Sequence, residues 1–140
     1  CIRDSVWGVQ QVPIALIKNG SGPTLILTGG NHGDDYEGPF FISELVRDLD
    51  STRVSGRLIL MPILNNSATQ AGQRVFPLDG LNLNRTFPGD PYGSITEQIY
   101  FYLNDHLFPV GDAYADPTLE AVPRTFYQVR LLNQHLRKNN

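Results

Sequence analysis

The chain has little cysteine, little charge and no long hydrophobic run. Its single Cys, at position 1 of 140 residues, leaves no disulfide within the chain and favours a reducing, cytoplasmic location. Charged residues make up 18% and the net charge is −3, without a basic stripe, so we expect no nucleic-acid partner. No apolar run approaches the roughly 18 residues that a membrane-spanning helix needs, so we also expect no membrane partner.

Glycine and proline are frequent instead, with 13 and 10 residues, and they separate short apolar runs. The runs at 24–28 and 57–63 are typical of buried strands. Between them, helical spacing predicts a helix over 39–50. Its expected apolar stripe consists of Phe41, Leu45, Val46 and Leu49. A strand, helix and strand in this order predict parallel strands, and ligands bind beyond the carboxyl ends of such strands.

Weaker signals place the remaining elements. Residues 11–17 contain a proline and predict an edge strand, and residues 67–71 a short helix. The long loop at 72–92 has regularly spaced apolar residues, so we expect it to be ordered. Ser94 and Glu97 form a capping box at the start of a helix that extends to about residue 107, with His106 expected on its packed stripe. A further strand is predicted at 112–116.

The chemistry is concentrated after the first buried strand, in Gly29-Gly30-Asn31-His32-Gly33-Asp34-Asp35-Tyr36-Glu37-Gly38. Zinc accepts imidazole nitrogen and carboxylate oxygen, and a catalytic zinc has three protein ligands and a water. His32 and Asp35, three residues apart on a tight loop, are therefore candidate metal ligands. The alternative is a solvated loop whose histidine caps the next helix.

A second polar segment occupies the long loop. Arg85 can bind a carboxylate with two parallel hydrogen bonds, and Asn84 beside it can add a directional one. Arg74, earlier in the same loop, could face a developing oxyanion. The alternative is that both arginines are surface partners of acidic residues.

The two segments together, Gly-Asn-His-Gly-Asp-Asp-Tyr-Glu-Gly and then Asn-Leu-Asn-Arg-Thr-Phe-Pro-Gly, resemble the succinylglutamate desuccinylase/aspartoacylase family. Its members are zinc amidohydrolases related to the zinc carboxypeptidases. The sequence looks most like members that deacetylate N-acetyl-diaminobutyrate in ectoine breakdown, and the likeness covers about residues 10–116. It implies an α/β fold, an incomplete zinc-carboxypeptidase-like domain with a mixed, largely parallel sheet flanked by helices.

The resemblance also implies a role for each candidate residue. His32 would be the first zinc ligand, and Asp35 occupies the position of the second, which is usually Glu in the family. Arg74 would polarise the scissile carbonyl, while Asn84 and Arg85 would hold the α-carboxylate of the substrate. The expected reaction is attack of a zinc-activated water on the amide of a small-molecule N-acyl amino acid.

From residue 117 the resemblance ends. The family continues Asp-Leu-His-Ser-Gly-Gly, whose histidine is the third zinc ligand, whereas this chain reads Asp116-Pro117-Thr118-Leu119. Codons for Asp-Pro-Thr-Leu that lose one C can encode Asp-Leu-His-Ser. We therefore expect residues 1–116 to be the N-terminal part of a zinc amidohydrolase catalytic domain and 117–140 an aberrant tail made by a frameshift. The encoding DNA tests this hypothesis, which requires the string CTA-CAC-TC at the junction.

The expected function is thus zinc-dependent deacylation, impaired in this chain because the third ligand and the family's general base have no match. A metallocarboxypeptidase is the alternative among enzymes. A non-catalytic fragment that retains some metal or carboxylate binding is the alternative from another class, and zinc content separates it from the enzyme. A truncated sheet would expose an apolar edge, so we also expect self-association, which sedimentation would detect.

Overall fold

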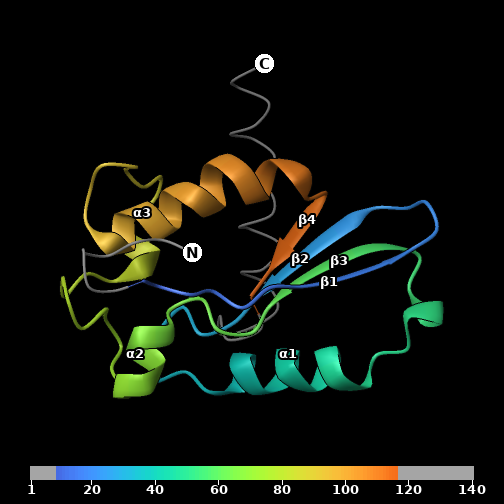
Figure 1. Cartoon of the computed structure of the whole chain (residues 1–140), viewed down its shortest axis with the longest axis horizontal. Coiled ribbons are helices and arrows are strands. Elements are labelled where there is room, and N and C mark those ends of the chain that lie inside the picture. Colours follow the sequence, from blue (N-terminus) through green and yellow to red (C-terminus); the bar gives the residue numbers. More distant parts are fainter. Residues whose placement is uncertain (1–8, 117–140) are drawn as a thin grey trace.

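The computed structural model describes residues 9–116, which form a four-stranded sheet with helices on both faces (Figure 1). The strand order is β1-β3-β2-β4. Strand β2 pairs in parallel with β3 and β4, and β1 pairs antiparallel with β3. The strands are β1 (Ala15–Asn19), β2 (Thr24–Thr28), β3 (Gly56–Met61) and β4 (Ala113–Ala115). This is the mixed, largely parallel α/β arrangement expected from the sequence; the proposed tail at 117–140 lies outside the described residues.

The central strands lie where the sequence predicts them, whereas the edge strand expected at 11–17 is displaced towards 15–19. Strands β2 and β3 occupy the middle of the sheet, and α1 (Glu37–Asp48) connects them. Strand β1 is an edge strand, but it begins only at Ala15, after Pro13. A proline has no N–H to give to a ladder, which explains why regular pairing begins beyond it.

The remaining helices follow β3. They are η1 (Ser51–Arg53), α2 (Asn66–Ala71), η2 (Leu83–Arg85), α3 (Ile95–Tyr102), the π-turn η3 (Leu103–Leu107) and η4 (Phe108–Val110). The capping box is confirmed, because Ser94 Oγ accepts the N–H of Glu97 and Glu97 Oε2 accepts the N–H of Ser94. Within residues 9–116 we find no helix with the length and apolar character that crossing a membrane requires.

The main hydrophobic core lies between the sheet and α3 with its continuation. Alternate residues of the two central strands face α3, while Leu60, on the opposite face of β3, is buried without belonging to this cluster. The core includes Ile26, Ile59, Met61, Leu64, Phe76, Leu83, Ile95, Ile99, Leu103, Leu107, Phe108 and Tyr114.

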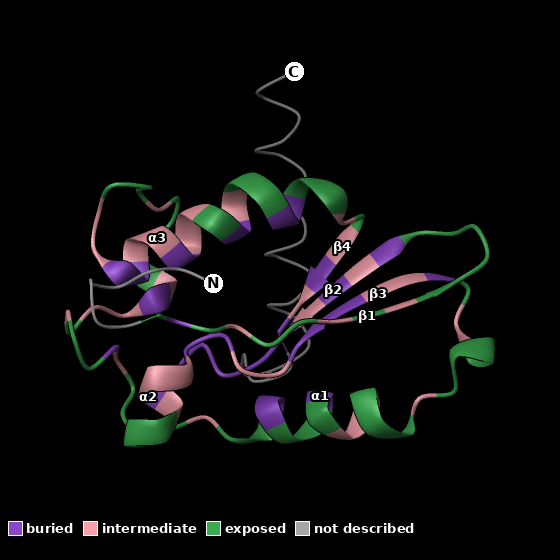
Figure 2. Ribbon diagram, viewed as in Figure 1, coloured by how far each residue is buried: buried purple, intermediate pink, exposed green. Residues whose placement is uncertain are grey.

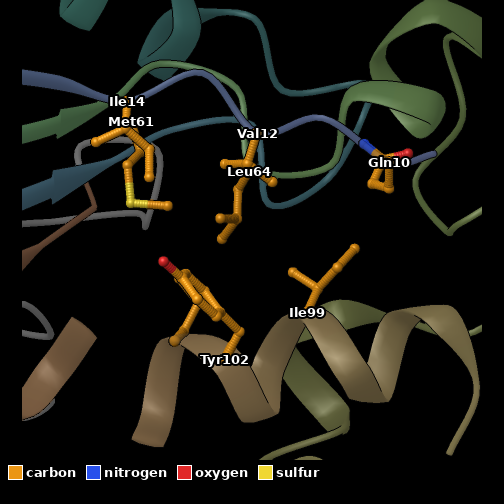
Figure 3. A pocket seen from close by; sticks show the side chains of 8 residues that line it. Gln10, Val12, Ile14, Met61, Leu64, Ile99 and Tyr102 are labelled. Atoms are coloured by element: carbon orange, nitrogen blue, oxygen red, sulfur yellow. The ribbon is translucent and has the colours of Figure 1, made fainter. Parts of the chain in front are cut away.

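A small cavity of about 70 Å³ interrupts this core. Figure 3 shows Ile99 and Tyr102 of α3 facing Met61, Leu64 and the segment before β1 across it. Its wall is mostly apolar, with Gln10 and Tyr102 as the polar exceptions, and it shares no residue with the polar segments at 29–38 and 72–92. The cavity is therefore separate from the candidate functional site.

The predicted buried face of α1 was partly wrong. Ile42 is fully buried, whereas Phe41 and Val46 are exposed. Much of α1 is exposed in Figure 2, and these two apolar residues belong to that exposed part. A Cβ at Gly29 would lie only 2.7 Å from the backbone of Gly38, which shows how closely the start of α1 approaches the end of β2. That contact sets the rotation of α1, and local periodicity could not reveal it.

The predicted packing of His106 was also wrong. Its side chain is 57% exposed and lies 3.5 Å from the carboxylate of Asp105. The ring contacts those of Phe101 and Tyr102, which are close in sequence. The π-turn η3 contains His106, and the turn changes the helical register that the prediction assumed.

Candidate metal and substrate site

The loop that carries His32 follows β2 and is bound along one side by the segment after β3. The carbonyl oxygen of Gly29 accepts a hydrogen bond from the N–H of Leu64 at 2.9 Å. The carbonyl oxygen of Gly30 accepts one from the N–H of Asn65 at 2.9 Å. Gly30 has a φ of +64°, a left-handed conformation that glycine adopts without steric cost. The loop is thereby fixed at the carboxyl edge of the sheet, where a ligand site was expected.

Gly33 holds the other end of this loop against α2. Its N–H donates to the carbonyl oxygen of Gln73 at 2.9 Å. A Cβ at this position would lie 2.0 Å from the carbonyl carbon of Ala68, so no other residue fits without movement of the backbone. His32 therefore projects from a backbone held at both ends, and it is only 6% exposed.

The structure brings His32 and Asp35 together, as the sequence predicts. Nδ1 of His32 lies 2.9 Å from Oδ2 of Asp35. The imidazole is buried, whereas the carboxylate retains partial contact with solvent. The pair thus keeps contact with solvent through Asp35, and a catalytic zinc likewise keeps one coordination position open to water.

The other ring nitrogen of His32 meets the loop at 72–92. Nε2 lies 3.2 Å from Oδ1 of Asn82. That oxygen also accepts the backbone N–H of Asn84 at 3.0 Å, which fixes the orientation of the Asn82 amide. Because an amide oxygen can only accept, this contact requires a proton on Nε2 of His32.

A second contact at Nε2 would favour the opposite tautomer of His32. Nδ2 of Asn84 lies 3.4 Å from Nε2, and an N–H donor there would require a lone pair on the ring nitrogen. The two contacts cannot both be hydrogen bonds to one tautomer. The Asn82 contact is shorter and its oxygen is fixed by a backbone donor, so we assign the proton to Nε2.

This tautomer makes the donor set suitable for a cation. With the proton on Nε2, the lone pair of Nδ1 faces the Asp35 carboxylate at 2.9 Å, and two electron-rich atoms so close need a proton or a metal ion between them. Two tetrahedral zinc ligands at about 2.0–2.2 Å from the ion are about 3.3–3.6 Å apart, so a small opening of the pair would admit zinc. The described residues therefore supply two of the three protein ligands of a catalytic zinc. Residues 9–116 contain no group of three His, Cys, Asp or Glu side chains that could hold a metal.

The two arginines belong to the loop at 72–92, and they have fewer contacts with the His32 loop than the asparagines of that loop have. Arg74 is exposed, and its Nη1 lies 3.9 Å from Oδ1 of Asp34, a neighbour of the metal pair in the sequence. Such a pair between exposed side chains is weak and can be exchanged for a bound anion. Arg85 is exposed on η2, one residue after Asn84. The structure thus places the side chain of Asn84 next to His32, whereas the arginines approach the pair only through their neighbours in sequence.

Asp79 fixes the loop at 72–92, which carries both arginines and the asparagines near His32. Its carboxylate accepts the N–H of Leu81 at 3.0 Å, and the N–H and hydroxyl of Thr96 at 3.0 and 2.9 Å. Burial alone raises the pKa of Asp79, but these hydrogen bonds outweigh it and the net pKa is lowered. The loop is ordered, as expected, because a charged anchor ties it to the start of α3.

Asn82 is the functional candidate that sequence reasoning missed. Its side chain caps η2 by accepting the N–H of Asn84, and the same oxygen orients His32. The sequence carried one usable signal, since Asn before a short turn is a common cap. Nothing local, however, relates Asn82 to an imidazole 50 positions away.

We expect Asn82→Ala to weaken zinc binding by the chain about 10–100-fold, the usual effect of losing a group that orients a metal-binding histidine. Asn82→Asp keeps the acceptor and should bind zinc nearly as the parent chain does. A competition titration against a chromophoric chelator measures both. Asn19→Ala is the matched control, because that amide bonds only the backbone near η1, at the other end of the sheet. Equal loss in the alanine variants of Asn82 and Asn19 would contradict an orienting role.

Comparison with known proteins shows the family to which the chain belongs. Residues 21–115 match the model of the succinylglutamate desuccinylase/aspartoacylase catalytic domain, and the chain belongs to this family. The match includes all five candidate residues and Asn82.

Individual relatives are similar over most of the chain. An N-alpha-acetyl-L-2,4-diaminobutyric acid deacetylase of Halomonas elongata is 46% identical over 125 residues, which are 86% of this chain and 36% of the relative. The product-bound ectoine utilization protein EutE of Ruegeria pomeroyi is 49% identical, with a TM-score of 0.76, over 81% of this chain and 35% of that one. A succinylglutamate desuccinylase/aspartoacylase of Rhodobacter sphaeroides is 45% identical, with a TM-score of 0.76, over 79% and 34% of the two chains. The chain thus spans about a third of the length of these relatives.

Proposed function

We propose that this chain is part of a zinc-dependent amidohydrolase that removes the acyl group from a small N-acyl amino acid. The observation that carries the proposal is the convergence of His32, Asp35 and Asn82 at one rim of the sheet, with Nδ1 of the imidazole 2.9 Å from the carboxylate. Membership of a family that includes desuccinylases and deacetylases supports this reaction class.

His32 through Nδ1 and Asp35 through Oδ2 would hold the zinc ion. Zinc, when bound, supplies Lewis-acid chemistry and activates water near neutral pH. Asn82 keeps the proton on Nε2 of His32, which leaves Nδ1 free to bind the metal. The Asp35 carboxylate offsets part of the ion's charge, and burial of the imidazole limits competing water.

Arg85, Asn84 and Arg74 would bind the substrate. The exposed guanidinium of Arg85 is free to form the two parallel hydrogen bonds that a carboxylate accepts, and Asn84 adds a donor next to His32. Arg74 would leave its distant partner Asp34 to reach the acyl carbonyl and the oxyanion that forms from it. Together these groups orient an anionic substrate with its amide towards His32 and Asp35.

The names of the relatives suggest the substrate. A deacetylase of N-alpha-acetyl-L-2,4-diaminobutyric acid is among them, so an N-acetylated diamino acid is the substrate class that we propose. We also retain the proposal that residues 1–116 are the N-terminal part of such a domain, followed by an aberrant tail. The end of the family match at residue 115 supports that boundary.

Turnover by the 140-residue chain should be impaired. Residues 9–116 offer two charged or imidazole ligands at the rim, and no group of three. This observation also favours the second candidate, a non-catalytic fragment that keeps metal or carboxylate affinity. The two differ in one measurement, because only the enzyme releases acetate from the N-acetylated substrate.

Substrate binding tests the proposal. We expect Arg85→Gln to weaken binding of N-acetyl-2,4-diaminobutyrate to the zinc-loaded chain at least about tenfold, the effect of losing one hydrogen-bonded charge. Arg53→Gln is the matched control, since Arg53 is an exposed arginine on η1, at the opposite end of the sheet. Isothermal titration calorimetry measures both constants. Binding that survives in Arg85→Gln, or absence of zinc in the parent chain, would contradict the proposal.

A further inference from the structure

A cluster of buried polar side chains lies beneath the His32 loop, between β2 and β4. It comprises Thr28, Asn31, Tyr114 and Asp116, each no more than 9% exposed. The hydroxyl groups of Thr28 and Tyr114 are 2.6 Å apart and join the neighbouring ends of the two strands. None of these residues belongs to the metal or substrate groups described above.

Asn31 and Asp116 form the centre of the cluster. Nδ2 of Asn31 donates a hydrogen bond to Oδ2 of Asp116, across 85 positions of sequence. Asp116 follows the last residue of β4, and Asn31 directly precedes His32. A carboxylate buried this deeply is strongly destabilising unless hydrogen bonds compensate it, so the Asn31 amide is held firmly in place.

The tyrosines around Asp116 remain donors. Burial, and secondarily the negative charge of Asp116, raise the pKa of the Tyr114 hydroxyl, while hydrogen bonds from Thr28 and Asn31 oppose the shift only in part. The same two causes raise the pKa of Tyr100. The raised pKa values keep these phenols protonated at neutral pH.

The cluster holds the His32 loop from the β4 side, in addition to the bonds on its β3 side. On the β3 side, backbone hydrogen bonds from Leu64 and Asn65 hold Gly29 and Gly30. On the β4 side, Asn31, the residue next to His32, donates to the carboxylate of Asp116 and also bonds the hydroxyl of Tyr114. Without that carboxylate the residue just before His32 would lose its bond to Asp116, and the imidazole would depend on the backbone bonds at Gly29, Gly30 and Gly33 and on the contact with Asn82. A metal pair tolerates displacements of only about 0.2 Å.

We propose that Asp116 is a positioning residue that acts through Asn31 to hold His32 in the orientation in which its Nδ1 meets Asp35. The inference rests on the zinc site proposed above. Asp116 does not touch metal or substrate in this role; it fixes the residue beside the ligand. It makes the end of β4 part of the machinery of a site otherwise built on β2 and on the loop at 72–92.

The test compares Asp116 with the other carboxylate that β4 presents to β2. Asp112 lies at the opposite end of this strand, and its Oδ2 accepts the N–H of Thr24 at 2.7 Å. We expect Asp116→Ala to lower zinc affinity about 10–100-fold, and Asp116→Asn, which keeps an acceptor, to restore it to within about threefold of the parent chain. Asp112→Ala should lower the melting temperature and leave zinc affinity unchanged.

A second readout needs no metal. Long-range proton–nitrogen NMR spectra of the metal-free chain report the protonation and surroundings of both ring nitrogens of His32. Asp116→Ala should shift both signals, and Asp112→Ala should leave them in place. Asn31→Ser, which shortens the donor and leaves the carboxylate, should shift them as well and provides a second variant if Asp116→Ala does not fold.

The outcomes separate the two proposals. Zinc affinity and His32 signals that are unchanged in Asp116→Ala, with only a lower melting temperature, would make the cluster purely structural and overturn the inference. A parent chain that binds no zinc would overturn the proposed function, while the metal-free spectra would still decide whether Asp116 positions the imidazole.

Discussion

We expect replacement of His32 by alanine to reduce zinc binding by this chain to background. His32 provides one of the two ligand atoms that the described residues bring together, and the remaining carboxylate of Asp35 is partly exposed to competing water. The loss should exceed the about 10–100-fold typical of residues that only orient a ligand. Competition with a chromophoric chelator, together with the metal content after dialysis, measures the effect.

The control for this result is His106→Ala. His106 is exposed on η3, where its nearest acidic partner is Asp105, and it should not affect zinc. Asp35→Asn removes the charge of the second ligand and keeps its shape, so its affinity should fall between those of the parent chain and His32→Ala. Zinc retained by His32→Ala but lost by His106→Ala would place the metal elsewhere.

Replacing Gly33 by alanine destabilises the whole domain. The added methyl carbon would lie 2.0 Å from a backbone carbon of α2, in contact with backbone that cannot rotate away. Overpacking typically costs about 1–3 kcal/mol and occasionally more, and a clash with backbone belongs at the upper end of that range. For a chain of this size, a loss of about 3 kcal/mol lowers the melting temperature by roughly 10 °C.

Gly20→Ala separates this clash from the general effect of losing a glycine. No atom lies within 4 Å of a Cβ at Gly20, and the cost there arises from its φ of +67°, about 1–2 kcal/mol. Urea unfolding gives both free energies on one scale. A Gly33→Ala chain as stable as the Gly20→Ala chain would show that the His32 loop is not held tightly against α2.

Strong local patterns made most of the fold predictable. The apolar runs of β2 and β3 and the capping box of Ser94 and Glu97 indicate their structures within a few residues. The buried face of α1 was not predictable in this way, because it depends on the contact of Gly29 with the backbone of Gly38. Its apolar residues Phe41 and Val46 are exposed, and self-association remains a prediction that this surface favours.

The candidate site likewise combines contacts that local sequence predicts with contacts that only the tertiary fold creates. His32 and Asp35 are three residues apart, so their meeting follows from the loop itself. Asn82 and Asp116 reach the same loop from positions 50 and 85 residues distant from their partners, and only the folded sheet brings them there. Sequence can therefore suggest which groups bind, whereas the groups that aim them emerge from tertiary structure.

This division affects how the chain would release a metal on unfolding. The chelating pair is local and could capture an ion even in an unfolded chain, but the tautomer that exposes Nδ1 depends on Asn82, 50 residues away. Unfolding the sheet would thus free the His32 ring to adopt either tautomer and any orientation, and zinc affinity would fall in the same cooperative step. Tight zinc binding, rather than binding as such, would then report whether the loop at 72–92 is folded against the His32 loop.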